Sequence, residues 1–220
     1  MLFPNLVTHH VYNDCGLPPY DAQAYQYILA GNGVFVRTET PFFEAIIPVA
    51  SSTVRGLPSL QFRFRLKVSR IPGRLLTTAL AVARRARRLD GELNEVLYHF
   101  HHQGQTVQLK RPRQHATRTS IIATGSNDQA ILCELHSHGE MPAFFSRTDD
   151  ADEQGARIYA VVGRLDTAPE IRVRLGVYGY WHPLPVAAVF TGTAGFKDLY
   201  LNKEKHTPCP SPLPLNQRGN

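Results

Sequence analysis

The stretch that decides the fold and the chemistry of this chain spans residues 135–149 and reads Leu-His-Ser-His-Gly-Glu-Met-Pro-Ala-Phe-Phe-Ser-Arg-Thr-Asp. Its first half places His136 and His138 one residue apart. Alternate side chains of an extended chain share a face, so both imidazoles can point at one ion while Ser137 points away. A carboxylate at Asp149, arriving from the next helix, would supply a third ligand and leave the fourth tetrahedral position open for water. The pattern therefore predicts a zinc site that activates water.

The composition is that of a globular protein. The chain has 220 residues, of which 43% are hydrophobic, enough to bury a sizeable core. It has no apolar run of about 18 residues and no signal-like amino terminus, so we expect a cytoplasmic protein without a membrane partner. Cys15, Cys133 and Cys209 form no Cys-x-x-Cys pair, which argues against a cysteine-rich zinc knuckle. Any metal would then be held by histidine and carboxylate.

The formal net charge of +6 and the sequence pI near 9.4 raise the question of a nucleic-acid partner. Much of the excess lies in two groups: Arg84, Arg85, Arg87 and Arg88, and Lys110, Arg111, Arg113 and Arg118. Neither group is interleaved with aromatic residues that could stack on bases. We interpret them as a solvated helix face and a basic loop, and keep DNA binding as a weaker hypothesis.

Residues 1–70 form a β-rich N-terminal region. An Ala-Gly-Asn-Gly turn at residues 30–33 predicts a hairpin, and further apolar or alternating runs follow it. The region is therefore expected to be a small β-meander. Its predicted strands are residues 25–29, 34–37, 42–49 and 60–68.

Residues 71–193 form a second unit in which helical and extended patterns mix, which predicts an α/β fold. Residues 194–220 end in a proline-rich run from Thr207 onward and are expected to form a flexible tail. The predicted helices of the second unit are residues 74–89 and 149–155. Its predicted strands are residues 92–100, 106–110, 119–123, 130–138, 157–165, 170–178 and 186–190.

Several of these residues also have a simpler interpretation. Ser146 and Asp149 have the spacing of a helix-capping pair. Phe144 and Phe145 could be ordinary core residues. A second histidine cluster, His99, His101 and His102, has no acid or cysteine at ligand spacing, and we interpret it as a set of strand-end residues.

The run His136-Ser137-His138, seven residues and Ser146-Arg147-Thr148-Asp149 resembles the JAMM motif of MPN-plus or JAB-domain metalloproteases. That motif is a glutamate, His-Ser/Thr-His, seven residues and Ser-x-x-Asp. The resemblance covers about residues 73–190 and implies a JAB/MPN-like mixed β-sheet flanked by helices. The whole chain also resembles proteins encoded in the bacterial PRTRC cassette of conjugative elements and plasmids, which also encodes ThiF-like and ParB-like proteins.

The resemblance implies a zinc-dependent peptidase or isopeptidase that acts on a ubiquitin-like tail or a related small carrier protein. Possible further partners are the ThiF-like and other cassette proteins. Carried over residue by residue, His136, His138 and Asp149 bind zinc and Ser146 steadies the oxyanion. A non-catalytic JAB-fold scaffold in a DNA-maintenance complex, with the basic groups contacting DNA, is the alternative function.

The resemblance also implies an upstream glutamate that takes the proton from water, about forty residues before the histidines. Both Glu95 and Glu92 meet this condition, and we prefer Glu95 because it adjoins an apolar strand. Glu134 shares a strand face with His136 and is a local alternative. The family usually has proline where this chain has Gly139 and Phe145, which changes the backbone stiffness at the rim of the site. The segment 139–145 is a candidate for a flap.

Overall fold

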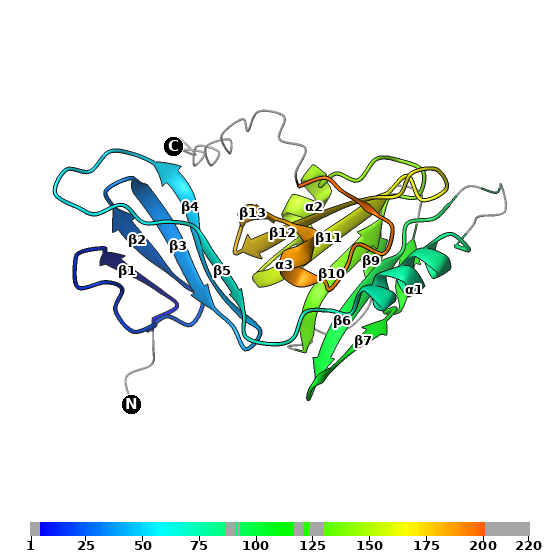
Figure 1. Cartoon of the computed structure of the whole chain (residues 1–220), viewed down its shortest axis with the longest axis horizontal. Helices are drawn as coiled ribbons and strands as arrows, with labels where there is room; N and C mark the ends of the chain where they lie inside the picture. Colours follow the sequence, from blue (N-terminus) through cyan, green and yellow to red (C-terminus); the bar gives the residue numbers. More distant parts are fainter. Residues whose placement is uncertain (1–4, 87–90, 92, 117–120, 124–129, 201–220) are drawn as a thin grey trace, which may run out of the picture.

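A computed structural model describes residues 5–86, 91, 93–116, 121–123 and 130–200, with the backbone alone at 115–116 and 121–123. Within these residues, a five-stranded sheet formed by the first part of the chain lies beside a seven-stranded sheet (Figure 1). We call them the N-terminal sheet and the main sheet. The predicted α/β class with a β-rich N-terminal region is confirmed.

The N-terminal sheet has the order β1-β2-β3-β4-β5. The predicted meander from β2 to β5 and its hairpin turn are confirmed, and Ala30 pairs with Gly33 across the turn. Strand β1 was not predicted, and it runs parallel to β2. Its sequence is mostly polar and half-buried, so it lacks the alternation that marks a strand. The strands are β1 (Val7–Val11), β2 (Tyr25–Ala30), β3 (Gly33–Glu39), β4 (Phe43–Ser51) and β5 (Arg63–Leu66).

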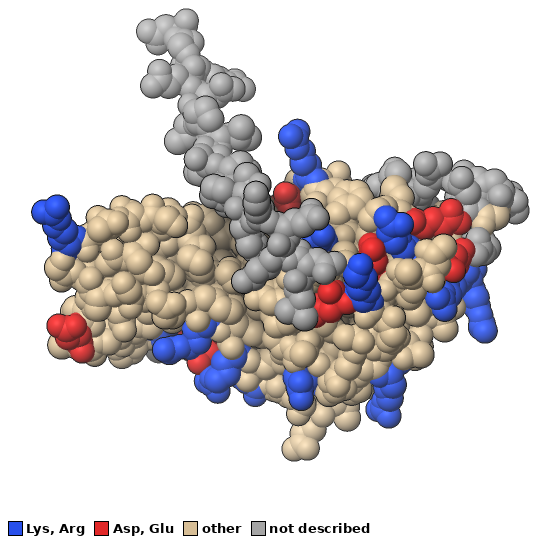
Figure 2. Space-filling model, turned by 45° about the horizontal axis from the view of Figure 1, so that its top comes forward, with Lys and Arg blue, Asp and Glu red and all other residues tan. Residues whose placement is uncertain are grey.

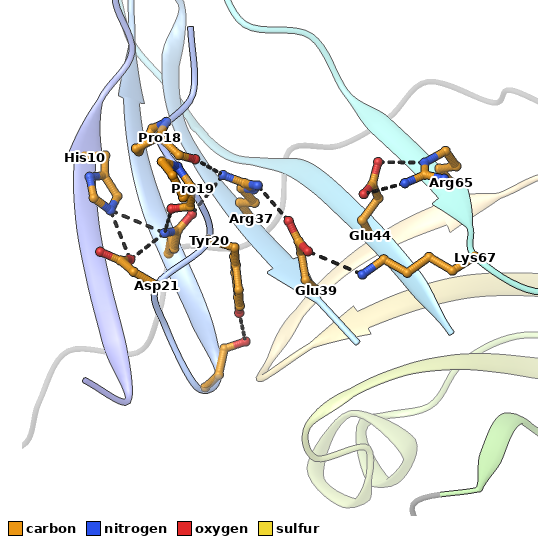
Figure 3. Close-up of polar contacts among 12 residues, drawn as sticks. His10, Pro18, Pro19, Tyr20, Asp21, Arg37, Glu39, Glu44, Arg65 and Lys67 are labelled. Carbon is orange, nitrogen blue, oxygen red and sulfur yellow. Dashed lines mark hydrogen bonds and ion pairs between the residues drawn. The ribbon is translucent and has the colours of Figure 1, made fainter. Parts of the chain in front are cut away.

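A polar network crosses the N-terminal sheet (Figure 3). The buried Gln26 amide donates to Asp21 at 2.6 Å, and the Gln26 carbonyl accepts from Arg37 at 3.3 Å. Arg37 also donates to Glu39 at 2.7 Å, and Glu39 pairs with Lys67 at 3.3 Å. The network ties the irregular segment after β1 to the strands and leaves the Glu39 carboxylate neutralised on both sides.

The main sheet has the order β13-β12-β11-β10-β6-β7, with β14 paired to β12. It is mixed, because β10 runs parallel to β11 and antiparallel to β6. Its strands are β6 (Leu97–Gln103), β7 (Thr106–Lys110), β10 (Ile131–Ser137), β11 (Ala156–Gly163), β12 (Glu170–Val177), β13 (Tyr180–Leu184) and β14 (Lys197–Asp198). The helices are α1 (Gly73–Ala83), α2 (Arg147–Asp152) and α3 (Val186–Val189).

Two predicted strands are wrong. The run 186–190 forms helix α3 after Pro185, and a short apolar run does not by itself distinguish a buried helix from a buried strand. Residues 119–120 lie outside the described residues, and the rest of the run 119–123 does not continue the main sheet, since among the described strands β9 (Ile121–Ala123) pairs with β8 (Gln114–Ala116) in a separate two-stranded sheet. The predicted strand 92–100 begins later, at Leu97. Helix α1 ends at Ala83, and residues 87–89 of its predicted range lie outside the described residues.

The two sheets share one hydrophobic core, in which Phe43 of β4 joins the same buried cluster as Leu76 of α1 and Phe100 of β6. Tyr27 and Tyr180 join the sheets by a hydroxyl hydrogen bond of 2.6 Å. At the other end of the chain, Phe196 is buried and β14 pairs with β12, so residues 194–200 pack on the main sheet. The rest of the predicted tail, residues 201–220, lies outside the described residues.

Candidate metal centre

Strand β10 lies between β6 and β11 in the main sheet and carries the two histidines at its carboxyl end. The strand alternation turns Ser137 to the opposite face, where it is buried and its hydroxyl oxygen accepts from the Val96 N–H at 3.0 Å. His138 follows the last strand residue, and its own N–H donates to the Val162 carbonyl at 2.8 Å. Pairing with both neighbouring strands therefore fixes the backbone under both imidazoles.

The side chains of His136, His138 and Asp149 converge. His136 Nε2 lies 3.1 Å from His138 Nε2 and 3.3 Å from Asp149 Oδ1. One ligand atom from each of the three residues lies within 4.8 Å of the others. Zinc ligands at 2.0–2.1 Å in a tetrahedron lie about 3.4 Å apart, so the spacing suits that ion. Among the described residues, no other group of histidine, cysteine and acidic side chains meets this criterion.

Both histidines are in the form that binds metal at neutral pH. Burial lowers the pKa of His136 to about 4, against the opposing effect of the Asp149 charge. Burial also lowers the pKa of His138. The Nδ1 atom of His138 lies 3.3 Å from the Pro142 carbonyl, and a proton donated there leaves Nε2 free for a cation. The donor set of two neutral imidazoles and one carboxylate matches that of zinc hydrolases.

Ser146 and Asp149 form a complete capping box at the start of α2. The Ser146 hydroxyl oxygen accepts from the Asp149 N–H at 3.2 Å, and Asp149 Oδ2 accepts from the Ser146 N–H at 2.5 Å. The capping interpretation is correct, and it is compatible with ligation because Oδ1 remains turned toward His136. Helix α2 begins at Arg147, two residues before the predicted start.

Glu95 lines the same cavity as the three candidate ligands and Ser146; the cavity volume is about 290 Å³. It lies just before β6 and is 6% exposed. Burial raises the pKa of Glu95 to about 7, and the nearby Asp149 charge adds to the effect. Glu134 lines the cavity too, but its carboxylate forms an ion pair with Arg157. Glu92 lies outside the described residues. Among the described acids that line the cavity, Glu95 is buried and has no cationic partner within the described part of the chain.

The comparison with known families bears directly on this arrangement. Residues 72–176 match the prokaryotic homologs of the JAB domain. The match contains all five candidate site residues and excludes the N-terminal sheet. The second unit of this chain therefore has a JAB/MPN-like fold, and it is similar to a domain family that includes metal-dependent isopeptidases. No curated protein matches the chain. None of the described helices has both the length and the apolar character needed to cross a membrane.

The two departures from the usual JAB motif have structural causes. Gly139 has φ of 57°, a left-handed conformation that proline cannot adopt, and a Cβ there would lie 3.0 Å from Leu93 Cβ. Phe145 is half-buried, and its ring meets His136 edge to face with the centroids 6.3 Å apart. Its neighbour Phe144 is 43% exposed and packs edge to face on His138 at 4.7 Å. The interpretation of Phe144 as a core residue is therefore wrong, because its side chain is exposed and lines the cavity.

Arg174 of β12 was not anticipated from the sequence. Its buried guanidinium donates to Asp150 of α2 and to Glu153 just after this helix, each at 2.7 Å. It also lies 3.8 Å from the centroid of Phe145 and 5.0 Å from that of Trp181. Burial raises the pKa of Glu153 to about 8, which the Arg174 charge opposes. An arginine within the apolar run of β12 is the signal that could have identified this residue.

Among the described residues, no other histidine and no lysine or arginine of the two basic groups lines the metal cavity. His99 and His101 are buried within β6, so the strand-end interpretation is wrong for them. Arg84 donates from Nε to the Leu165 carbonyl at 2.7 Å and thus serves the JAB fold. On the face drawn in Figure 2, lysine and arginine side chains are scattered among acidic ones rather than gathered in one patch. Arg87, Arg88 and Arg118 lie outside the described residues.

Proposed function

We propose that this protein is a zinc-dependent peptidase or isopeptidase. The observation that carries the proposal is the convergence of His136, His138 and Asp149 at ligand spacing, with the buried acid Glu95 on the same cavity. The match of this segment to JAB-domain homologs supports the same conclusion. A structural ion would need no acid beside it, whereas hydrolysis requires one to move a proton.

The residues divide into ligands, a base and an oxyanion donor. A zinc ion held by His136, His138 and Asp149 would act as a Lewis acid that polarises a carbonyl and makes water a better nucleophile at neutral pH. Glu95 accepts the water proton and passes it to the leaving amine, a task suited to a pKa near 7. The Ser146 hydroxyl oxygen accepts a hydrogen bond from the Asp149 N–H. The hydroxyl proton of Ser146 therefore remains available to be donated to a developing oxyanion.

For the substrate we propose the tail of a ubiquitin-like or other small protein. Support comes from the JAMM resemblance and from the open cavity, which a narrow extended chain can enter. We further propose that the protein is protein A of a PRTRC cassette, with the ThiF-like and other cassette proteins as partners. This placement rests on the resemblance of the whole chain.

A non-catalytic scaffold that contacts DNA is the alternative. The net charge of +6 favours it. Two observations argue against the scaffold. Arg84 is hydrogen-bonded within the fold, and the lysine and arginine side chains on the face drawn in Figure 2 do not form one patch. We therefore favour the hydrolase.

The test combines metal content with turnover. Protein purified without chelator should hold about one zinc ion per chain. Glu95→Gln should keep that zinc and lose cleavage of fusions to the cassette's ubiquitin-like protein by at least about 100-fold. Glu140→Gln is the matched control, because Glu140 is exposed and does not line the cavity. A folded, zinc-free protein, or unchanged turnover in Glu95→Gln, would contradict the proposal.

A further inference from the structure

We propose that the N-terminal sheet forms one wall of a substrate groove, which holds an extended polypeptide segment of the substrate leading to the metal cavity. Asp152 selects a lysine or arginine side chain in that segment. This inference rests on the proposed function and extends it to the part of the chain that the JAB-domain match leaves out.

The groove lies between the two sheets and has a volume of about 720 Å³. The N-terminal side contributes residues 23–24 and the turn between β3 and β4, residues 38–42. The JAB side contributes the end of α2, the start of β11 and Tyr178. A groove walled by segments so far apart in sequence exists only because the N-terminal sheet packs beside the JAB domain.

The groove adjoins the metal cavity. Asp152, the last residue of α2, lines both spaces. Arg157 lines the groove, and its guanidinium pairs with Glu134, which lines the metal cavity. In the proposed binding mode, a chain that runs from the groove to the metal cavity passes Asp152.

Contacts between the two units fix the groove walls. The rings of Tyr25 and Tyr178 lie 5.5 Å apart, and the rings of Phe42 and His102 lie 5.6 Å apart. Tyr178 and Phe42 themselves line the groove, so each wall touches the opposite unit beside the open space. A preformed groove of this kind binds an extended segment without first having to order its own walls.

The charges in the groove leave one carboxylate uncompensated. Glu39 is held by Arg37 and Lys67, as Figure 3 shows, and Arg157 is held by Glu134. Asp152 is exposed, and among the described residues no cation pairs with it. A cationic side chain complements this carboxylate, whereas the phosphates of a nucleic acid would be repelled.

The groove also offers neutral polar groups that suit a peptide backbone. Gln23 and Gln154 are exposed on opposite walls. The Gln154 amide already donates one hydrogen bond to the Ala151 carbonyl at 2.7 Å, which leaves its oxygen and second N–H for a peptide unit; an amide can both donate and accept, as a peptide unit requires. The occupant that fits is therefore a protein segment containing a basic residue.

The experiment measures binding to an array of immobilised decapeptides in which lysine, glutamate or norleucine replaces alanine at each position in turn. Zinc-loaded full-length Glu95→Gln is the probe, so peptides are bound without turnover. We expect lysine peptides to bind up to about fivefold better than glutamate peptides at a defined position, the range of an exposed ion pair. Asp152→Lys, added to the probe, should reverse this preference. A lysine at the end of a helix suits the helix dipole, so α2 should persist.

Two control variants separate the groove from general effects. Asp14→Lys makes the same charge change at an exposed aspartate that does not line the groove, and it should leave the preference unchanged. Gln23→Trp should weaken binding of all the peptides by filling the groove from the N-terminal side. Thr53→Trp, at an exposed position outside the groove, should not.

The outcomes distinguish this inference from the proposed function. Equal binding of lysine and glutamate peptides, no binding to any peptide, or a preference that Asp152→Lys leaves intact would overturn the groove assignment. Charge-selective binding that Asp152→Lys reverses would support it. If that binding is found while the wild-type protein cleaves none of the peptides or fusions, the hydrolase proposal fails and the groove assignment stands.

Discussion

The guanidinium of Arg174 lies 3.8 Å from the centroid of the Phe145 ring. Phe145 in turn meets His136. Arg174 also binds Asp150 of α2, the helix that carries Asp149, and Glu153, the residue that caps this helix. One buried side chain of β12 thus contacts the supports of two candidate ligands that come from different elements. Arg174 is therefore a positioning residue that fixes the distance between β10 and α2.

Replacing Arg174 should loosen the site. Arg174→Met leaves the Glu153 carboxylate buried without its partner and should cost about 3 kcal/mol in the free energy of unfolding. We expect zinc affinity to fall about 10-fold, since groups that orient metal ligands have effects of that size. Arg174→Lys should restore part of the lost stability and part of the lost zinc affinity. Urea unfolding and competition with a chromogenic chelator measure the two quantities, and unchanged zinc affinity in Arg174→Met would refute the positioning role.

Substitutions at Ser146 separate its capping role from its chemical role. Ser146→Gly should lower the free energy of unfolding by only a few tenths of a kcal/mol, because glycine is tolerated at the N-cap, and Ser146→Ala by about 1 kcal/mol. Both remove the hydroxyl and should lower kcat by about 100-fold or more. Ser146→Thr keeps the hydroxyl and should keep most activity. Activity that follows stability across the three variants would mean that Ser146 only caps the helix.

Glu95 should make zinc binding depend on pH. Its pKa is about 7 in the metal-free protein, and a cation bound beside it favours the charged carboxylate. Zinc binding at pH 6 should therefore release about one more proton in the wild type than in Glu95→Gln, and zinc affinity should fall as pH falls below 7. Calorimetry in buffers of different ionisation enthalpy measures this release. Equal proton release by the two proteins would contradict the assignment.

The same shift has a consequence for stability. The folded-state pKa of Glu95 lies above its ordinary value of 4.5. As pH rises, the unfolded chain therefore loses the Glu95 proton at a lower pH than the folded protein does. The metal-free protein should then lose stability as pH rises from about 4.5 to about 7, and Glu95→Gln should lack this loss. Denaturant titrations of both proteins at several pH values provide the measurement.

Gly139 should resist substitution for two reasons. Alanine there must adopt a left-handed conformation and approach Leu93 Cβ, so we expect Gly139→Ala to cost more than about 1 kcal/mol. Gly104→Ala is a matched control, because Gly104 has a similar φ of 61° and a Cβ added to it would meet no atom within 4 Å. Because Leu93 adjoins the Glu95 segment, Gly139→Ala should also lower turnover. Equal losses of stability in the two variants would show that the Leu93 contact is unimportant.

The sequence predicted the parts of the site that are close together along the chain. The spacing of His136, His138 and Asp149 predicted their convergence, because a strand end and the first turn of the next helix bring them together. Glu95 was preferred because it adjoins an apolar run, and it lines the same cavity as the candidate ligands, although the strand that follows it begins only at Leu97. Arg174 escaped prediction because its role depends on contacts with α2 and Phe145 that no local pattern encodes.

The fold likewise could be predicted only where local sequence patterns determine it. The meander of the N-terminal sheet has alternating apolar residues and a glycine turn, so it was predictable. Strand β1 was missed because it pairs in parallel with β2 and carries mainly polar residues. The apolar run at 186–190 was ambiguous, since its burial on the sheet suits a short helix as well as a strand. The groove between the sheets could not be predicted, as it depends on how the two units pack.

The most direct test of the central claim is anomalous diffraction at the zinc absorption edge, from crystals of protein purified without chelator. We predict one strong peak per chain, within about 2.2 Å of His136 Nε2, His138 Nε2 and an Asp149 oxygen, with no fourth protein ligand. The absence of a peak between these three side chains in a zinc-replete crystal, or a peak enclosed by four protein ligands, would contradict the account.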